Sequence, residues 1–100
     1  MKVYTESVHF KADQKLIDYI ELKLGKMDQF FDRIIDAKTI LKLENSGQVR
    51  DKVVEIILHI PGQTLVVKET NKTFEASIDS AVDTLKRQLI KYKQKMRRTS

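Results

Sequence analysis

Two stretches of alternating apolar residues, joined by Pro61-Gly62, constrain the fold of this chain more than any other feature. Alternation with a period of two is typical of a β-strand that buries one face. Residues 51–60 therefore predict one strand, and residues 63–69 predict the next. Pro and Gly favour a tight turn, and strands joined this briefly pair antiparallel. The residues expected on the buried face of the first of these strands are Val54, Ile56, Leu58 and Ile60.

The first half of the chain predicts a strand, a helix and a further strand. A short strand over residues 2–8 is rich in Val, Tyr and Thr. Asp13 is a suitable N-cap for a helix over about 14–30, in which apolar residues recur at helical spacing. Residues 34–44 then predict a strand, and a turn is expected at residues 45–48. In that strand we expect Thr39, Leu41 and Leu43 to face the core and Lys38, Lys42 and Glu44 to face outward.

A second helix is predicted to begin after Thr73, which is a suitable N-cap with Glu75 in the first turn. It should run to about residue 96 and be followed by a flexible polar tail over residues 97–100. Its apolar residues repeat at steps of three and four: Ile78, Ala81, Val82, Leu85, Leu89, Tyr92 and Met96.

The predicted order is therefore β-α-β-β-β-α. Each helix has one apolar stripe, and the sheet has one strongly apolar face. These surfaces are all buried when a four-stranded sheet carries both helices on one face, as an α+β two-layer sandwich. A chain of 100 residues without a linker or repeat is expected to form this single domain over residues 1–100.

The positive charge of the chain is concentrated at one end. Residues 1–85 contain 12 Lys/Arg and 14 Asp/Glu, whereas residues 86–100 contain seven Lys/Arg and no acidic residue. Arg87, Lys91 and Lys95 are spaced by four, so they stack along one side of the second helix and repel one another. A polyanion such as RNA would offset this repulsion. The alternative is a solvated cationic helix end that only complements its own dipole.

The first helix adds Lys15, Tyr19, Lys23 and Lys26 on the side away from its apolar stripe. These residues would widen the basic surface if the two helices lie side by side. Taken alone, the charges of the first helix favour an ordinary solvated face, because Asp18, Glu21 and Asp28 are interspersed among them.

Several classes of protein are disfavoured. The chain has no Cys, so disulfides, a thiolate nucleophile and Cys-based metal sites are excluded. No apolar run approaches the roughly 20 residues of a membrane-spanning helix, so a cytoplasmic protein is expected. His9 and His59 are predicted on different strands, with no metal-site spacing and no carboxylate pair or nucleophile beside them. We therefore predict no catalytic residue, no metal and no cofactor.

The outer face of the predicted sheet also carries apolar residues: Ile40, Val53, Ile57 and Val66. An exposed patch of this kind would mark a contact site, such as one for self-association of the chain. In the alternative, the sheet twists and the stems of Lys42 and Lys68 cover the patch. A monomer is expected for the free protein.

Two motifs resemble a known family. Residues 26–34 (KMDQFFDRI) are similar to the end of the first helix in the ribosome hibernation promoting factor and protein Y family. Residues 76–79 (ASID) and 85–93 (LKRQLIKYK) are similar to the second helix of that family. The resemblance covers essentially the whole chain, and the family has the same element order, which resembles that of double-stranded-RNA-binding domains. The chain is similar to the short form, without the C-terminal dimerisation domain.

The resemblance implies a function and a site. Such proteins bind the small ribosomal subunit, between head and body, where they exclude mRNA and tRNA and silence idle ribosomes in stationary phase. Whole ribosomes and a separate dimerisation-promoting factor are further implied partners. The matching RNA-contacting positions are Lys23 and Lys26 in the first helix and Lys86, Arg87, Lys91, Lys93 and Lys95 in the second. Charge alone adds Arg97 and Arg98.

Two other functions remain open on the sequence. One is a generic double-stranded-RNA-binding or nucleoid-binding module of the same layout. The other is a small acid–base enzyme that uses His9 or His59.

Overall fold

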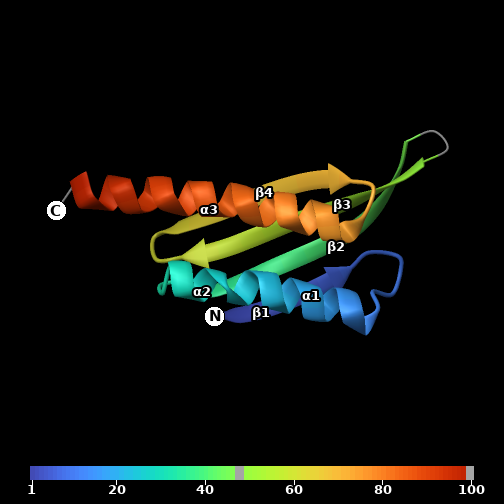
Figure 1. Cartoon of the computed structure of the whole chain (residues 1–100), viewed down its shortest axis with the longest axis horizontal. Coiled ribbons are helices and arrows are strands. Elements are labelled where there is room, and N and C mark those ends of the chain that lie inside the picture. Colours follow the sequence, from blue (N-terminus) through green and yellow to red (C-terminus); the bar gives the residue numbers. More distant parts are fainter. Residues whose placement is uncertain (47–48, 99–100) are drawn as a thin grey trace.

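The computed structural model describes the backbone of residues 1–46 and 49–98 and the side chains of residues 1–45 and 51–97. Its elements follow the predicted order, with the first helix divided in two (Figure 1). They are β1 (Lys2–Ser7), α1 (Gln14–Gly25), α2 (Met27–Phe30), β2 (Asp36–Ser46), β3 (Val49–Ile60), β4 (Gln63–Asn71) and α3 (Phe74–Arg98).

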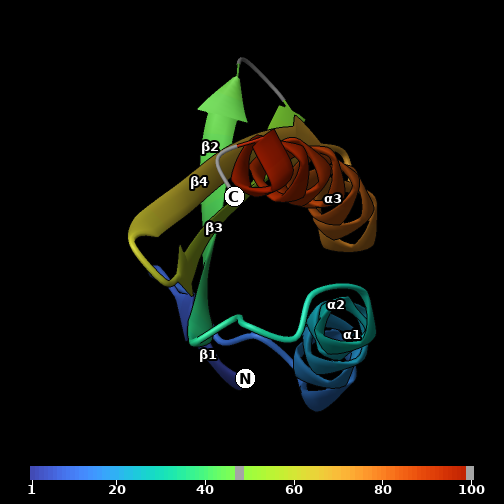
Figure 2. The same ribbon diagram turned by 90° about the vertical axis from the view of Figure 1, so that its left-hand side faces the viewer.

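The strands form one sheet in the order β1-β2-β3-β4. β1 pairs with β2 in parallel, and the other neighbouring strands are antiparallel. Gly62 adopts a φ of 77° in the turn between β3 and β4, a conformation that favours glycine over other residues. Figure 2 shows α1, α2 and α3 on the same side of the sheet. The predicted α+β fold, with the helices on one face, is confirmed.

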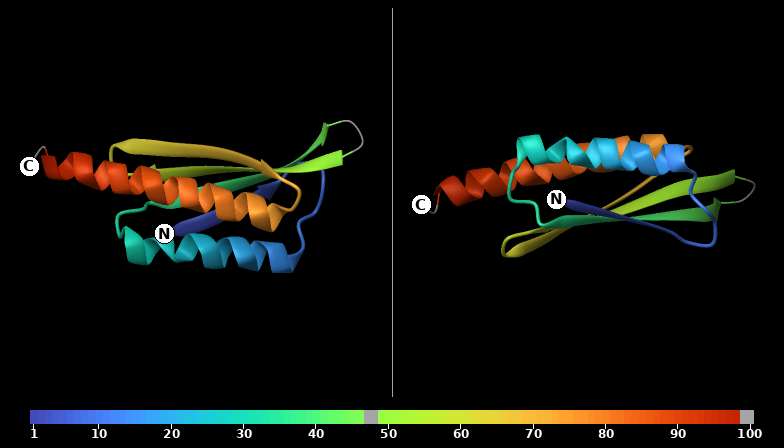
Figure 3. Two further views of the ribbon diagram at one scale, coloured as in Figure 1. Left: turned by 45° about the horizontal axis from the view of Figure 1, so that its top comes forward. Right: turned by 90° about the horizontal axis from the view of Figure 1, so that it is seen from below.

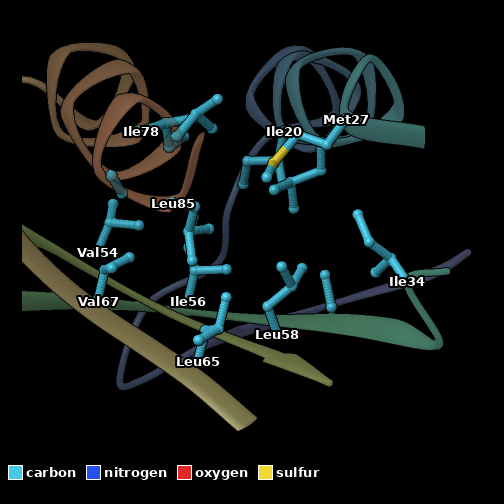
Figure 4. Close-up of a cluster of buried hydrophobic side chains, with 14 of the residues drawn as sticks. Ile20, Met27, Ile34, Val54, Ile56, Leu58, Leu65, Val67, Ile78 and Leu85 are labelled. Atoms are coloured by element: carbon cyan, nitrogen blue, oxygen red, sulfur yellow. The ribbon is translucent and has the colours of Figure 1, made fainter. Parts of the chain in front are cut away.

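The core lies between this face of the sheet and the helices. Ile56 and Leu58 of β3 point toward the helices, and Leu85 of α3 meets them from the other layer (Figure 4). All three side chains are 0% exposed, and Ile20 of α1 is 1% exposed. Each such residue contributes roughly 1.5–3 kcal/mol through burial, so the helices are held firmly on the sheet.

Both predicted helix caps are confirmed. The Asp13 carboxylate accepts a hydrogen bond of 2.8 Å from the Leu16 backbone N–H. The Thr73 hydroxyl accepts one of 3.1 Å from the backbone N–H of Ala76. In the same turn of α3, the buried Ser77 hydroxyl donates to the backbone carbonyl of Lys52 at 2.7 Å. The start of α3 is therefore fixed to β3.

The single helix predicted over 14–30 is wrong in one respect, because it divides at Lys26 into α1 and α2. Lys26 keeps right-handed helical backbone angles (φ −64°, ψ −22°), and Met27 and Phe31 stay on the buried side, at 0% and 5% exposed. At the other end of the chain, α3 extends through Arg98, two residues beyond the predicted end near 96. Residues 99–100 of the predicted tail lie outside the described residues.

The predicted turn at 45–48 is wrong at its first two positions, because residues 45 and 46 belong to β2 and pair with β3. Residues 47 and 48 lie outside the described part of the chain.

On the face of the sheet opposite the helices, the apolar residues do not form one continuous exposed patch. Val66 is 54% exposed, but Val53 is 0% exposed, so the predicted patch is wrong at Val53. An ion pair of 3.8 Å between Lys68 of β4 and Glu44 of β2 crosses β3 on this face, beside Val53. Covering of the patch by the stems of Lys42 and Lys68 stays a prediction.

Candidate nucleic-acid interface

The basic residues of the last part of the chain lie on a helix that the core holds in place. Leu85 and Leu89 of α3 are 0% exposed. One turn further on, the Tyr92 hydroxyl donates a hydrogen bond of 3.2 Å to the Pro61 carbonyl. The Tyr92 ring packs edge-on against the Phe31 ring, with the two ring centres 5.8 Å apart. The C-terminal end of this helix continues past the end of the sheet (Figure 3). The cations therefore begin on an anchored segment and end on a projecting one.

Two hollows separate these cations into two groups. Lys91 and Lys95 line the β4–α3 hollow, of about 400 Å³, which they share with residues 63–66 of β4. Lys93 and Arg97 line the loop–α3 hollow, of about 270 Å³, on the other side of the helix. The remaining residues around the loop–α3 hollow are Phe31, Asp32, Arg33, Tyr92 and Met96. Positive charge is thus presented on both flanks of α3.

Lys93 is held more tightly than a solvated lysine. Its ammonium donates a hydrogen bond of 2.7 Å to the backbone carbonyl of Phe30, the last residue of α2. It also lies 4.8 Å from the centre of the Phe30 ring and 5.7 Å from that of Phe31. The carbonyls at the end of a helix lack intrahelical partners, so this contact satisfies one of them. Lys93 therefore joins α3 to α2 in addition to contributing charge.

On α1, Lys23 faces α3 and is paired with an acid. Its ammonium lies 3.5 Å from the Asp79 carboxylate and 5.5 Å from the centre of the Tyr19 ring. Asp79 also accepts a hydrogen bond of 2.6 Å from the Tyr19 hydroxyl, and this bond raises the pKa of Tyr19 to about 12. α1 and α3 are thus linked side by side, which extends the basic surface onto α1 while Asp79 partly neutralises Lys23.

The other predicted residues lie around these contacts. Lys26, between α1 and α2, is exposed, as are Arg87, Lys91, Lys95 and Arg97. Lys86 is half-buried. The backbone of Arg98 ends α3, and its side chain lies outside the described residues.

Two residues beside this surface were not selected from the sequence. Arg33, in the loop after α2, lines the loop–α3 hollow, although in the sequence it stands far from the basic segment. Asp79 was not expected to bind Lys23, because its position gives no sign that α1 packs against that turn of α3.

The histidine prediction needs correction. The Nδ1 atom of His59 lies 2.5 Å from the Asp36 carboxylate, so His59 does have a carboxylate beside it. The antiparallel pairing of β2 with β3 places these two residues opposite each other. His9 lies beyond the end of β1, with a φ of 63°, and not on a strand as predicted.

In the part of the chain that the structure describes, no three His, Asp or Glu side chains gather to hold a metal ion. None of the described helices is both long and apolar enough to cross a membrane.

Fold and surface together define a class: a small two-layer α+β domain that displays a cationic C-terminal helix. Known proteins with this arrangement are found by comparison. The sequence profile of the family described as "Sigma 54 modulation protein / S30EA ribosomal protein" matches residues 3–97. A ribosome hibernation promoting factor from Pseudomonas putida is 36% identical over 95 residues, which cover 95% of this chain and 89% of that protein.

Solved structures agree with this result. The N-terminal domain of Thermus thermophilus protein Y superimposes with a TM-score of 0.79 at 29% identity, covering 92% of this chain and 99% of that domain. A ribosomal subunit interface protein from Coxiella burnetii gives a TM-score of 0.83 at 21% identity, covering 94% and 99%, and supports the fold. The chain therefore belongs to the Sigma 54 modulation protein / S30EA ribosomal protein family, which comprises ribosome hibernation factors and is not a family of enzymes.

Proposed function

We propose that this chain is a cytoplasmic ribosome hibernation factor that binds the RNA of the small ribosomal subunit through the basic surface of α3 and α1. The observation that carries the proposal is the run of seven Lys/Arg without an acid in residues 86–100, on a helix whose buried residues fix it to the sheet. The names of the relatives supply the ribosome as the partner. The charge and its placement supply RNA as the chemical target.

The mechanism that fits this surface is steric occlusion. The folded domain binds phosphates in the decoding channel and occupies the space that mRNA and tRNA need. Arg87 is the residue best suited to a central contact, because a guanidinium can bind a phosphate through two parallel hydrogen bonds. Lys91 and Lys95 act as point charges beside it. Shape fit to the RNA, more than base reading, would give specificity.

We propose no catalytic step for this protein. The pair formed by His59 and Asp36 is the strongest alternative, but it lies where β2 begins and β3 ends, and the strand alternation places His59 on the face of the sheet opposite the helices. A variant with both His9 and His59 replaced by Ala should therefore still bind ribosomes and retain its inhibition of translation. Loss of inhibition with retained binding would favour an enzyme.

The decisive experiment reverses two charges on α3. Arg87→Glu with Lys91→Glu should abolish co-sedimentation with ribosomes at low salt, while circular dichroism shows an unchanged fold. The matched control is Lys11→Glu with Lys72→Glu, which alters the net charge equally at two exposed positions outside this surface. Unchanged sedimentation of the α3 variant would refute the site.

Salt dependence and competition complete the test. Each neutralised phosphate releases counterions. The logarithm of the affinity for ribosomes should therefore fall linearly with the logarithm of the salt concentration, with a slope of roughly 0.7–0.9 per phosphate contacted. Binding to isolated RNA duplexes as tightly as to ribosomes would favour the generic RNA-binding module instead.

A further inference from the structure

The loop–α3 hollow combines an apolar wall with a cluster of cations. Its apolar lining comes from Phe31, Tyr92 and Met96. The wall is fixed, because Phe31 is 5% exposed and packs edge-on against the Tyr92 ring, which the Pro61 carbonyl holds through a hydrogen bond. Met96 is 47% exposed, so about half of this apolar residue is accessible beside the rigid wall.

Three cations stand around the same hollow: Arg33, Lys93 and Arg97. Lys93 is already oriented by the Phe30 carbonyl and by two aromatic rings. An ammonium has three donors, so the carbonyl leaves donors for an anion. Because its position is set in advance, Lys93 loses little conformational freedom when it binds. Asp32 is the one acidic residue of the lining.

This pairing of surfaces selects a particular ligand chemistry. A cluster of cations alone would suit any phosphate or carboxylate. An exposed apolar surface directly beside the cations suits an anion that carries a flat, hydrophobic group, and a nucleotide has this composition. The Asp32 carboxylate can accept a hydrogen bond from an exocyclic amine or a ribose hydroxyl.

We propose that the loop–α3 hollow binds one unpaired RNA nucleotide, with the base against Met96 and the Tyr92–Phe31 wall and the phosphate among Arg33, Lys93 and Arg97. The proposal rests on the proposed function, since it assumes that the surrounding surface of α3 binds RNA. It adds a site that recognises a base, next to a surface that recognises only phosphates. The alternative ligand for this hollow is an acidic peptide segment of another protein.

The test measures binding of the full chain to two probes at one salt concentration. One probe is a fluorescent single-stranded oligoadenylate, and the other is the same oligomer with abasic ribose units. The unaltered protein should bind the first about tenfold more tightly, within the range known for the stacking of one base on a side chain. Met96→Ala should remove this preference and leave the affinity for the abasic probe unchanged.

Two matched controls separate this site from general effects. Ile90→Ala removes an apolar side chain that is 42% exposed on the same helix, compared with 47% for Met96, but is not part of the hollow's lining. It should keep the preference. Arg33→Ala should weaken binding of both probes and lower the salt slope by about 0.7, whereas Lys72→Ala, at an exposed position at the other end of α3, should not.

Three results would overturn the proposal. They are equal binding of the two probes by the unaltered protein, an equal loss of preference in Met96→Ala and Ile90→Ala, and tighter binding of an acidic peptide than of oligoadenylate that depends on Met96. Any of these, combined with normal co-sedimentation with ribosomes, would leave the proposed function standing. Failure of the unaltered protein to co-sediment would instead remove the proposed function.

Discussion

Replacing Lys93 with Met separates the two roles that the structure gives this residue. Met keeps an unbranched stem of similar length and removes the ammonium that joins α3 to the Phe30 carbonyl. A hydrogen bond from a charged group contributes about 1.5–3 kcal/mol, and this one lies in a partly solvated site, which reduces its value. Loss of the cation–π contacts is offset in part, because a Met sulfur also packs well against Phe30 and Phe31.

We therefore expect Lys93→Met to lower the free energy of unfolding by about 1–2 kcal/mol. For a domain of this size, 1 kcal/mol shifts the Tm by roughly 4–8 °C, so the expected decrease in Tm is roughly 5–15 °C. Thermal and urea unfolding followed by circular dichroism measure both quantities. The urea dependence of the unfolding free energy should stay unchanged, because the surface exposed on unfolding is the same.

Lys91→Met is the matched control, because Lys91 is exposed on the same helix and only lines the β4–α3 hollow. Its effect on stability should stay within about 0.5 kcal/mol, as for most surface substitutions. Both variants should lower the salt slope of ribosome binding by a similar amount, since each removes one cation. Equal stability of the two variants would refute the role of Lys93 as a link between α3 and α2.

Other predictions concern the link between α1 and α3 and the core beneath the cations. Because Asp79 raises the pKa of Tyr19 to about 12, one phenol should titrate late in an ultraviolet absorbance titration, and Asp79→Asn should bring it back toward 10. The raised pKa means that this stabilisation is complete below pH 10 and is lost as the pH rises toward 12. Asp79→Asn should also tighten ribosome binding at low salt, since Lys23 no longer has an anionic partner, which a co-sedimentation titration measures. Leu89→Ala should lower the unfolding free energy by roughly 2–5 kcal/mol in urea denaturation, because Leu89 is 0% exposed.

Much of the fold follows from local rules that the sequence displays openly. Alternation places Ile56 and Leu58 on the buried face of β3, and both are 0% exposed. Asp13 and Thr73 identify the starts of α1 and α3, because capping depends on residues three positions away. These features could be predicted since they depend on neighbours in the chain.

The errors in the fold arise where distant segments decide. The apolar spacing predicts the burial of Met27, which is 0% exposed, but not the division of the helix at Lys26. Val53 is 0% exposed on the face away from the helices, and its partners in the sheet, Lys42 and Thr70, come from other strands. No spacing along the chain predicts the division of the helix or the burial of Val53.

The candidate site shows the same division between local and distant information. Clustering of cations in residues 86–100 is visible in the sequence, and the helical spacing predicts which of them are exposed. The partners of those cations are not visible: the Phe30 carbonyl for Lys93 and Asp79 for Lys23 lie 63 and 56 positions away along the chain. The distribution of charge in the sequence therefore predicts the basic surface. Only the packing of the helices shows which of its cations also link one helix to another.

The placement of the cations along α3 also predicts how this helix behaves before RNA is present. Like charges four residues apart each cost a few tenths of a kcal/mol, whereas each buried leucine contributes roughly 1.5–3 kcal/mol. As far along α3 as Leu89, the free energy gained by burying apolar side chains exceeds the cost of repulsion between the cations. The helix should therefore be formed in the free protein. The C-terminal end of the helix projects past the sheet (Figure 3), so burial offsets less of the repulsion there.

Hydrogen exchange should therefore divide α3 in two. Amides from Ile78 to Leu89 should exchange slowly in the free protein, and those after Tyr92 should exchange faster, because fewer buried contacts hold them. Added ribosomes should slow exchange chiefly after Tyr92, where RNA phosphates would reduce the repulsion between the cations. Fast exchange along the whole of α3 in the free protein would contradict a preformed surface, since the cations would then have no rigid support from which to bind RNA.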